Sequence, residues 1–532
     1  MLNKIIAQIE NIRWNKFPPD IFIQMKIVVI ILLLSLQSAL SQSGYNTTYD
    51  IGVALRFLSV ESTKDNIYIS GFYRKSSSDY QSGFVASVDS LGQLQWWSEI
   101  SDDSSSLSVS SESCFSLSGN NIIVFPFVYF NRPSFGVAIL NAFGSIESIQ
   151  EYPQDSGSVT SPRDILEIAD GYLITGWTTK PPLYYTNGFV MKVNFDGKKQ
   201  WMHEYGHPVY EENSRTISVV NSNYFVISGS QYQVDPLPAF DRSWAIAMDS
   251  TGKIIWDWYS DESEIPEKGI ASMQYDTLTH EWVYFTFFER PTTYPGETYD
   301  VLVPVFVRRD SAMNLISYEE FGPYAIHHYM GVLEPSMDGG WVAAGRYTTT
   351  TDDYVSPLST ESGRIIKLSK EGTLEWSVID TAFFHPELGS RSYLSGVTES
   401  PSGSIYAVGW ANNYNENDVY RSYGWLLKIT KDGCIDTLCT TSSLVQQIQD
   451  RESNVKVYPN PATDYLIVDY REQSFNRPSF ELYDLVGHLI LKDAVHEGVQ
   501  SYGLDDAFSG MYLWRVIDAH QNELDSGKLL IK

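Results

Sequence analysis

The sequence has little cysteine, little positive charge and few long hydrophobic runs. Three cysteines in 532 residues are too few for a disulfide-stabilised scaffold. The 37 basic residues face 65 acidic ones, and the net charge of −28 repels nucleic acid and anionic membrane surfaces. Outside the N-terminal region no apolar stretch has the length of a membrane-spanning helix. These absences argue against a nucleic-acid-binding protein, a disulfide-rich domain and a mature chain that crosses a membrane.

The residues that are plentiful favour strands and turns. Hydrophobic residues make up 43% of the chain, which is enough for a large buried core. Aromatic residues make up 14%, and there are 36 glycines. This mixture is typical of β-structure, and the length predicts more than one structural unit.

Residues Met25–Ser41 have the pattern of a secretory signal peptide. One lysine precedes an apolar core over residues 27–36, and small residues then lead to a cleavage site before Gln42. The alternative is an uncleaved anchor helix, although the apolar core is short for a bilayer span. Residues 1–24 precede this second methionine and are interpreted as a spurious or extended N-terminus. We therefore expect an exported mature chain.

One pattern recurs between residues 42 and 440: apolar strands, a tight turn, and a further strand often marked by Trp. The turn begins at steps of 52 to 61 residues, at Asp89, Asn141, Asn194, Asp249, Asp310, Ser369 and Thr430. Three residues later each copy has Gly, except one copy that has Met313. Such residues start turns through side-chain bonds to the backbone, and Gly supplies the positive φ.

Four strands per copy and seven copies predict an all-β fold, a seven-bladed β-propeller over residues 42–440. In this scheme Trp96, Trp201, Trp256 and Trp376 fill the space between blades. Six or eight blades remain open because two copies are degenerate. A string of β-sandwiches is the other alternative, and the regular turn spacing argues against it.

The connections between the second and third strands of each copy are long and rich in Tyr and Asp. Rigid, amphipathic tyrosines on loops over a stiff scaffold are typical of binding faces. The candidate binding face comprises Tyr80, Tyr184, Tyr185, Tyr294, Tyr299, Tyr354, Tyr414 and Tyr420. Hydrated loops without a ligand are the alternative.

Two cysteines near the end of the repeats are candidates for a disulfide. Cys434 and Cys439 flank the expected outer strand of the last copy, in an oxidising exported setting. Residues 441–454 are polar and are interpreted as a linker. A compact β-domain is expected over residues 455–532.

The C-terminal domain contains the most specific motifs in the chain. In order they are Val457-Tyr458-Pro459-Asn460-Pro461, Tyr483-Asp484-Leu485-Val486-Gly487, Gly510-Met511-Tyr512, and the terminal Lys528 to Lys532. They resemble the type A C-terminal sorting domain of the type IX (Por) secretion system of Bacteroidetes. The resemblance implies a small Ig-like β-sandwich that the secretion machinery recognises. It also implies removal by a sortase-like peptidase, followed by attachment to the cell surface or release.

No catalytic or metal-binding residues are assigned. His203-Glu204-Tyr205-Gly206-His207 matches a zinc-protease pattern, but that pattern requires a helix and the repeat places it on a strand. Two His four residues apart on a strand lie about 13 Å apart, too far for one zinc ion. No cofactor is expected. Asn412–Asp418 and Asp102-Asp103 are the stretches that could hold calcium.

The sequence thus predicts a secreted or outer-membrane surface protein. We interpret its propeller as a non-enzymatic binding or adhesion module for a glycan, peptide or protein ligand. The alternatives are an extracellular hydrolase or lyase acting on glycans or peptides, and a structural envelope protein. Carboxylate or His–carboxylate pairs at the mouth of the central channel would favour the enzyme.

Overall fold

The computed structural model describes residues 44–435 and 455–531, apart from short internal stretches. Those stretches are 77–78, 103–105, 109–114, 118–122, 130–131, 182–184, 208–209, 222–223, 234–240, 262, 295–296, 323–327, 349–360, 383–390, 415–419, 459–461, 463–464, 471–477, 485–488, 497, 505–509 and 518–522. The predicted signal peptide and linker lie outside the described residues. The chain divides into two compact units, Met1–Val445 and Gln446–Lys532. Every regular secondary-structure element among the described residues is a β-strand.

The first unit consists of consecutive antiparallel strand sets. The first three are β2 (Ala54–Ser62), β3 (Asn66–Arg74), β4 (Ser82–Asp89) and β5 (Leu94–Ile100); β6 (Leu107–Ser108), β7 (Ser116–Leu117), β8 (Ile123–Tyr129), β9 (Ser134–Leu140) and β10 (Ile146–Pro153); and β11 (Val159–Ile168), β12 (Gly171–Thr179), β13 (Thr186–Val193) and β14 (Lys199–Tyr205). The next two are β15 (Tyr210–Asn221), β16 (Tyr224–Gln233), β17 (Asp241–Asp249) and β18 (Ile254–Tyr259); and β19 (Ser272–Asp276), β20 (Glu281–Tyr294), β21 (Glu297–Asp310) and β22 (Leu315–Glu320). The last are β23 (His328–Pro335), β24 (Trp341–Thr348), β25 (Glu361–Leu368) and β26 (Leu374–Asp380); and β27 (Arg391–Glu399), β28 (Ile405–Tyr414) and β29 (Tyr420–Ile429), joined by β1 (Tyr45–Tyr49).

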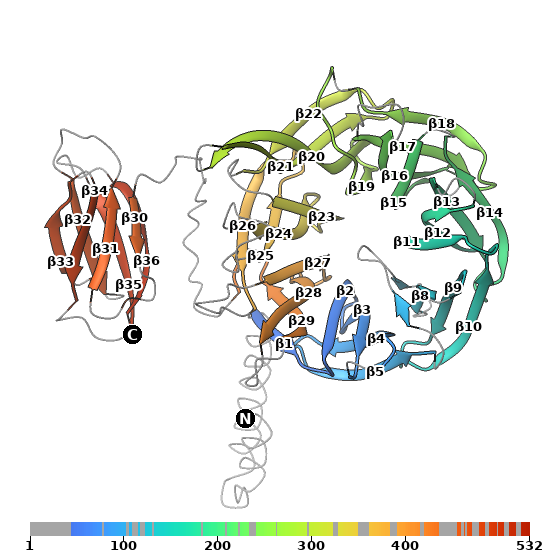
Figure 1. Cartoon of the computed structure of the whole chain (residues 1–532), viewed down its shortest axis with the longest axis horizontal. Coiled ribbons are helices and arrows are strands. Elements are labelled where there is room, and N and C mark those ends of the chain that lie inside the picture. The colour runs from blue at the N-terminus through green and yellow to red at the C-terminus, as the bar shows by residue number, and fades with distance from the viewer. Residues whose placement is uncertain are drawn as a thin grey trace, which may run out of the picture. The chain divides into compact units, whose positions relative to one another are not determined.

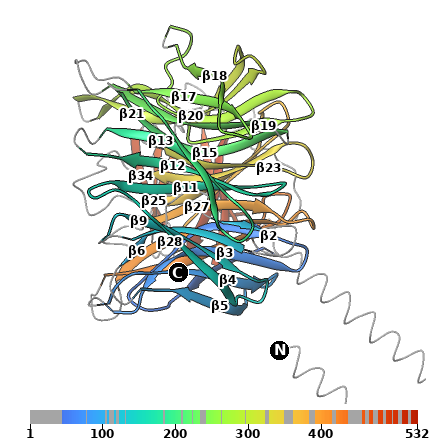
Figure 2. The ribbon, with the colours of Figure 1, turned by 90° about the vertical axis from the view of Figure 1, so that its right-hand side faces the viewer.

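These sets follow one another around a common centre (Figure 1). Strands β2, β11, β15 and β27 lie near the centre, while β5, β10, β14 and β18 lie on the outside. Figure 2 shows the strands from the side, running between the two faces of the ring. A radial array of four-stranded antiparallel sheets is the architecture of a β-propeller, so the expected fold class is confirmed at that level.

The N-terminal strand supplies the outer strand of the last set, which corrects the sequence interpretation. We expected the residues between Cys434 and Cys439 to form that strand. Instead β1 pairs antiparallel with β29, from Tyr45 opposite Lys428 to Tyr49 opposite Gly424. The Asn46 side chain accepts a bond of 2.8 Å from the buried Trp425 indole. Chain ends far apart in sequence therefore close the ring together, which local patterns cannot reveal.

The repeated tight turn forms as predicted. Its fourth residue donates to the carbonyl of its first in every copy, as Gly92 does to Asp89 at 2.9 Å. The Asp89 carboxylate also accepts the backbone N–H groups of Leu91 and Gln93. Met313, the one exception to glycine, has φ of 66°. Its side chain is buried with Trp256 and Trp258, which offsets the strain of that φ.

The glycine that ends the second strand of most sets has a physical cause. In five sets the first strand has a bulge, and the residue before it pairs with that glycine. A Cβ there would collide with the carbonyl of the first strand. The glycines are Gly71, Gly176, Gly229, Gly345 and Gly409.

The tryptophans of the outer strands pack against the next set, as expected. Trp96 lies against Gly144, Trp201 against Gly252 and Trp376 against Gly433, each at the turn of the following set. The Trp376 indole also donates to the Lys431 carbonyl at 3.1 Å. These three turn glycines therefore provide room for an aromatic ring of the neighbouring set.

Two connections predicted as loops are partly strand. Residues 289–300 continue β20 and β21 as a hairpin, with Tyr294 opposite Glu297 and Thr292 opposite Tyr299. Likewise Tyr414 pairs with Tyr420 at the end of β28 and β29. The strands extend because their Thr and Tyr residues favour extended backbone and their pairing continues without a register shift.

The second unit contains two antiparallel sheets that share one core. One sheet has β30 (Val455–Tyr458), β31 (Tyr465–Tyr470) and β34 (Gly498–Gly503). The other has β32 (Ser479–Asp484), β33 (Leu489–Ala494), β35 (Gly510–Ile517) and β36 (Glu523–Ile531). Leu466 and Tyr502 from the first sheet pack with Phe480 and Val516 from the second.

Candidate functional site

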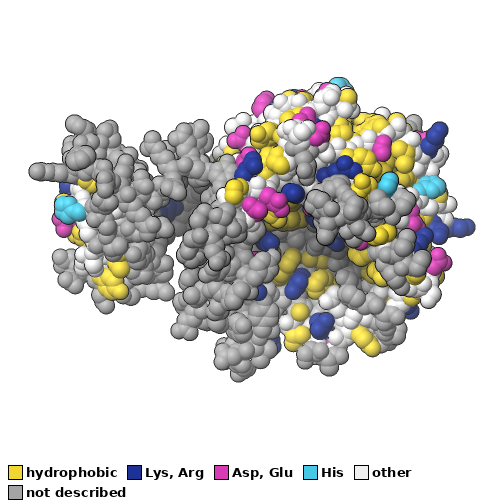
Figure 3. Space-filling view, turned by 45° about the horizontal axis from the view of Figure 1, so that its top comes forward, with side chains coloured by type: hydrophobic (Ala, Val, Ile, Leu, Met, Phe, Trp, Pro, Cys, Tyr) yellow, Lys and Arg dark blue, Asp and Glu magenta, His cyan; other side chains and the backbone are white. Residues whose placement is uncertain are grey.

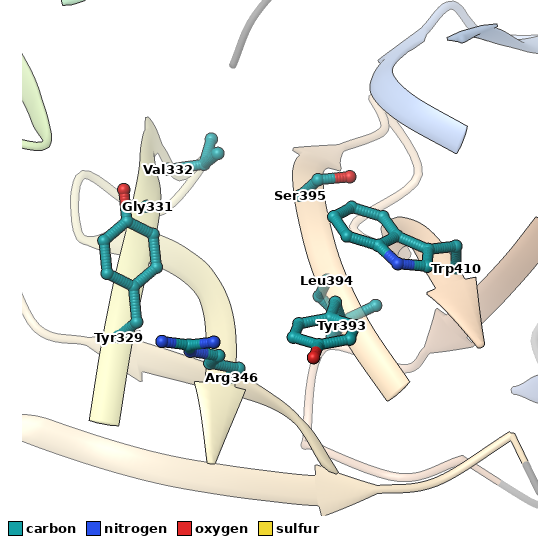
Figure 4. A pocket seen from close by; sticks show the side chains of 8 residues that line it. All are labelled: Tyr329, Gly331, Val332, Arg346, Tyr393, Leu394, Ser395 and Trp410. Carbon is teal, nitrogen blue, oxygen red and sulfur yellow. The ribbon is translucent and has the colours of Figure 1, made fainter. Parts of the chain in front are cut away.

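A cavity of about 270 Å³ lies between the inner strands of two neighbouring sets (Figure 4). Its lining residues are Tyr329, Gly331, Val332, Arg346, Tyr393, Leu394, Ser395 and Trp410. Tyr329 and Val332 lie on one side and Ser395 and Trp410 on the other, with Arg346 and Tyr393 between them. The cavity thus combines flat aromatic faces with one guanidinium.

Strand pairing places this cavity at one end of the ring. Tyr329, near the start of β23, pairs with Arg346, near the end of β24. Tyr393, near the start of β27, pairs in the same way with Trp410 on β28. The connections to the third strands leave from this end, so the cavity lies at the end of the ring that the sequence predicted to bind ligand.

The β2–β5 set, which follows the β27–β29 set around the ring, has the same cross-strand arrangement, with Arg56 opposite Phe72. We call Arg56, Phe72, Tyr329, Arg346, Tyr393 and Trp410 the mouth row; all six are half-buried. The Arg56 guanidinium lies 5.0 Å from the Trp410 ring and 5.6 Å from the Phe72 ring. Trp410 in turn stacks on Tyr393 at 4.9 Å and 21°. Aromatic rings and arginines therefore form one continuous stack across sets.

Glu361 fixes the polar ends of two cavity residues. It accepts a hydrogen bond from the Tyr393 hydroxyl and forms an ion pair of 3.3 Å with Arg346. Burial, and then the bond to Glu361, raises the pKa of Tyr393 above its usual value. The Tyr393 phenol is therefore neutral and acts as a hydrogen-bond donor rather than as a phenolate.

The opposite wall is held by residues from more distant sets. Tyr329 stacks on Phe287 of β20 at 4.9 Å and 11°. Its hydroxyl accepts a bond of 3.0 Å from Arg215 of β15. Five sets therefore contribute to or support the mouth row, and its geometry depends on the closed ring. Figure 3 shows a hollow in the ring whose visible wall carries hydrophobic and basic side chains.

The structure describes the side chains of two of the predicted binding tyrosines. Tyr80 is 55% exposed before β4, and Tyr185 is half-buried before β13. Tyr184 and Tyr354 lie outside the described residues, and the other four lie on strands, at Tyr294, Tyr299, Tyr414 and Tyr420. Tyr80 and Tyr185 are not among the described residues that line the cavity, and the binding face of eight tyrosines stays a prediction.

A simple sequence signal could have identified the mouth row. The residue directly after the second-strand glycine is large in four sets, at Phe72, Trp177, Arg346 and Trp410. Each of these residues pairs with the first-strand residue that lies two positions before the bulged residue. The bulge thus presents a repeated position toward the centre, whereas loop composition drew attention to the rim.

The rejected zinc-protease pattern lies on a strand, as predicted. His203 and Glu204 belong to β14, and His203 bonds to the Thr251 carbonyl at 3.1 Å. Among the described residues no group of His, Cys, Asp and Glu has the arrangement of a metal site. Cys434 is disulfide-bonded, and Cys439 lies outside the described residues, so their pairing stays a prediction.

One residue of the C-terminal motifs, Tyr483, contacts a buried carboxylate. Glu481 accepts bonds from Lys492 at 2.6 Å, from Arg515 at 2.8 Å and from the Tyr483 hydroxyl. Burial alone would raise the pKa of Glu481, but these donors hold it at about 2. Tyr512 is buried and Lys528 is exposed, while Tyr458, Asp484 and Gly510 lie at strand ends. Pro459, Asn460, Pro461, Gly487 and Lys532 lie outside the described residues.

Three solved structures are similar to this chain in fold. Semaphorin 2a of Drosophila is 7% identical, with 92% of this chain and 98% of that chain covered, at a TM-score of 0.42. The β-propeller domain of the Trilobed protease from Pyrococcus furiosus is 10% identical, with 75% and 99% covered, at 0.37. PorZ, a surface component of the type IX secretion system of Porphyromonas gingivalis, is 7% identical, with 92% and 100% covered, at 0.18. At such values the likeness says nothing about what this chain does.

The family comparison concerns the second unit. A comparison with curated protein sequences gave no match. In the described part of the chain we find no helix with the length and hydrophobicity to span a membrane. Residues 456–532 match the family model of the secretion system C-terminal sorting domain. The chain therefore carries a type IX sorting domain, which directs it to the secretion machinery and marks it for the cell surface or for secretion.

Proposed function

We propose that this protein is a non-enzymatic binding module that holds a ligand in the cavity of the mouth row. The observation that carries the proposal is the cavity itself, with aromatic faces and one arginine converging from two sets. Small-molecule sites are concave and mostly apolar, with a few placed polar groups. Its volume suits a small ligand or the terminal unit of a longer chain.

We also propose the number of propeller blades, the fold of the sorting domain and the route of export. The strand sets make a seven-bladed propeller closed by β1, and the sorting domain is an Ig-like sandwich with sheets of three and four strands. A signal peptide over residues 25–41 delivers the chain to the periplasm before the type IX step. A sortase-like peptidase then removes the sorting domain.

Two observations favour binding over hydrolysis. The described residues that line the cavity include no Asp, Glu or His, the residues that most often transfer protons in catalysis. The Glu361 carboxylate, which contacts two of the lining residues, accepts a hydrogen bond from Tyr393 and forms an ion pair with Arg346. An exposed carboxylate pair at this position would instead favour the hydrolase or lyase.

Thermal denaturation of the full chain with neutral oligosaccharides, short peptides and calcium tests the proposal. A ligand at a hundredfold excess over its Kd stabilises the fold by about 2.7 kcal/mol, a clear rise in Tm. Trp410→Ala should abolish this rise. Trp177→Ala is the matched control, because Trp177 occupies the same register in another set and does not line the cavity.

The outcomes separate the alternatives. A rise in Tm that is lost in Trp410→Ala and kept in Trp177→Ala supports the proposal. A rise that persists in Trp410→Ala places the ligand elsewhere and contradicts it. If chromatography shows that the protein cleaves the bound compound, the protein is an enzyme and the non-enzymatic proposal is wrong. No rise with any compound would favour a structural envelope role.

A further inference from the structure

The charge of the mouth row contrasts with the charge of the chain. The protein has a net charge of −28, yet Arg56 and Arg346 belong to the mouth row and Arg215 contacts its Tyr329. Only 37 residues of the chain are basic, so three arginines around one opening are a local excess. A guanidinium is favoured over an ammonium where a carboxylate is held by two parallel hydrogen bonds.

Arg346 is available to a ligand. Its side chain is 37% exposed, and its ion pair with Glu361 is a single contact of 3.3 Å from one terminal nitrogen. An ion pair of this exposure contributes little free energy, and the guanidinium has further N–H groups to donate. Glu361 is itself 14% exposed and accepts the Tyr393 hydroxyl, so its charge is offset on two sides.

The aromatic walls add a second requirement. Trp410 stacked on Tyr393 gives one flat face, and Tyr329 stacked on Phe287 gives another. Both stacks are fixed by neighbours, so the faces are pre-organised rather than formed on binding. Flat faces with hydroxyl and guanidinium donors at their edges suit a ring that is apolar on its faces and polar around its rim.

We propose that the cavity binds an acidic sugar residue, with the aromatic faces against its ring and Arg346 on its carboxylate. This inference rests on the proposed function and names its ligand class. One uronate unit fits the cavity volume of about 270 Å³, and further units extend out of the mouth.

Isothermal titration calorimetry of the full chain with trigalacturonate tests this inference. The fully methyl-esterified trisaccharide keeps the rings and removes the charges, and triglutamate keeps the charges and removes the rings. We expect trigalacturonate to bind at least tenfold more tightly than either. Arg346→Gln should weaken its binding at least tenfold, and Arg346→Lys should restore only part of the loss.

Arg308→Gln is the matched control, since Arg308 is also paired with a glutamate, at 2.7 Å, but does not line the cavity. The affinity of this variant for trigalacturonate should equal that of the wild type, and circular dichroism should show that each variant is folded.

The ester and the acid could instead bind with equal affinity, and Trp410→Ala could abolish the binding of both. That result would overturn the inference of an acidic ligand and leave the proposed function standing. Preference for triglutamate would replace the sugar with an acidic peptide. No binding of any probe would overturn the inference, and the broader thermal panel would then decide the proposed function.

Discussion

The β27–β29 set and the β19–β22 set show two ways to build the same sheet. The first has a bulge in β27, Gly409 opposite it and Gly433 in its turn. The second has no register shift between β19 and β20, Phe285 and Thr286 at the centre of β20, and Met313 in its turn. The second-strand glycine is therefore needed where the first strand bulges, and a set without the bulge can replace it with a larger side chain.

The β19–β22 set compensates through a buried polar cluster. Arg309 is 1% exposed and donates to Glu267 at 2.8 Å, to the Tyr284 hydroxyl at 2.7 Å and to the Met313 carbonyl at 2.9 Å. Its bond to Met313 holds the turn that lacks glycine. The bulged sets instead use their inner positions for the mouth row. The β19–β22 set therefore contributes this buried cluster and supports the candidate site only through Phe287, whereas three bulged sets supply the mouth row itself.

The largest effect is expected when the cluster is broken. Arg309→Met should lower the free energy of unfolding by about 3–5 kcal/mol, because Glu267 would remain buried without its cation. Burial already raises the pKa of Glu267, and Arg309 opposes that rise. Urea denaturation measures the loss. Adding Glu267→Gln should recover part of it, and a loss below about 1 kcal/mol would show that the cluster does not stabilise this set.

The next effect concerns the glycine opposite the bulge. Gly409→Ala should cost about 2–3 kcal/mol, because its Cβ would lie 2.7 Å from the Tyr393 carbonyl carbon and 2.8 Å from the Leu394 Cα. Gly403→Ala is the control: its φ is +80°, but the nearest atoms to a Cβ are 3.9 Å away. It should cost about 1 kcal/mol, from backbone strain alone. Equal losses would mean that the bulge does not require glycine.

The smallest effect concerns two carboxylates at the same register of bulged sets. Glu61 on β2 lies four residues after Phe57, which pairs with Gly71. Glu334 on β23 lies four residues after Met330, which pairs with Gly345. Burial raises the pKa of Glu61 from 4.5 to about 7. Burial, with the charges of Glu61 and Asp164, raises the pKa of Glu334 well above its usual value.

Because the folded chain binds these protons more tightly than the unfolded chain, the contribution of these two carboxyls to stability is greatest below pH 4.5 and falls as the pH rises toward 7. Glu61 is half-buried by area, so we expect a loss of only about 1–2 kcal/mol over this range. Urea denaturation at pH 5, 6, 7 and 8 measures it. Glu61→Gln should flatten the dependence, and Glu147→Gln, at an exposed site, should not. An unchanged slope in Glu61→Gln would contradict the assignment.

Local chemistry explains why the repeats could be found from the sequence. The turns at Asp89 and its equivalents depend on a side-chain acceptor and a positive φ, both encoded within four residues. The motifs of the sorting domain are likewise local, and they match a family model over residues 456–532. The closing strand β1 was missed because its partner β29 lies more than 370 residues away. The candidate binding face was predicted among the Tyr-rich loops because composition marks loops, whereas the mouth row depends on a bulge that composition does not mark.

The sequence by itself determined that this is a strand-rich, repeated, strongly acidic chain with a sorting domain at its C-terminal end. Those properties follow from composition and short spacings. The tertiary structure alone decided that the Arg56–Phe72, Tyr329–Arg346 and Tyr393–Trp410 pairs meet, because they come from three sets and the first of these joins the other two only when the ring closes. It also decided that Glu361 holds Tyr393 and Arg346 together. Long-range closure brings these groups into contact, and no pattern within one repeat encodes it.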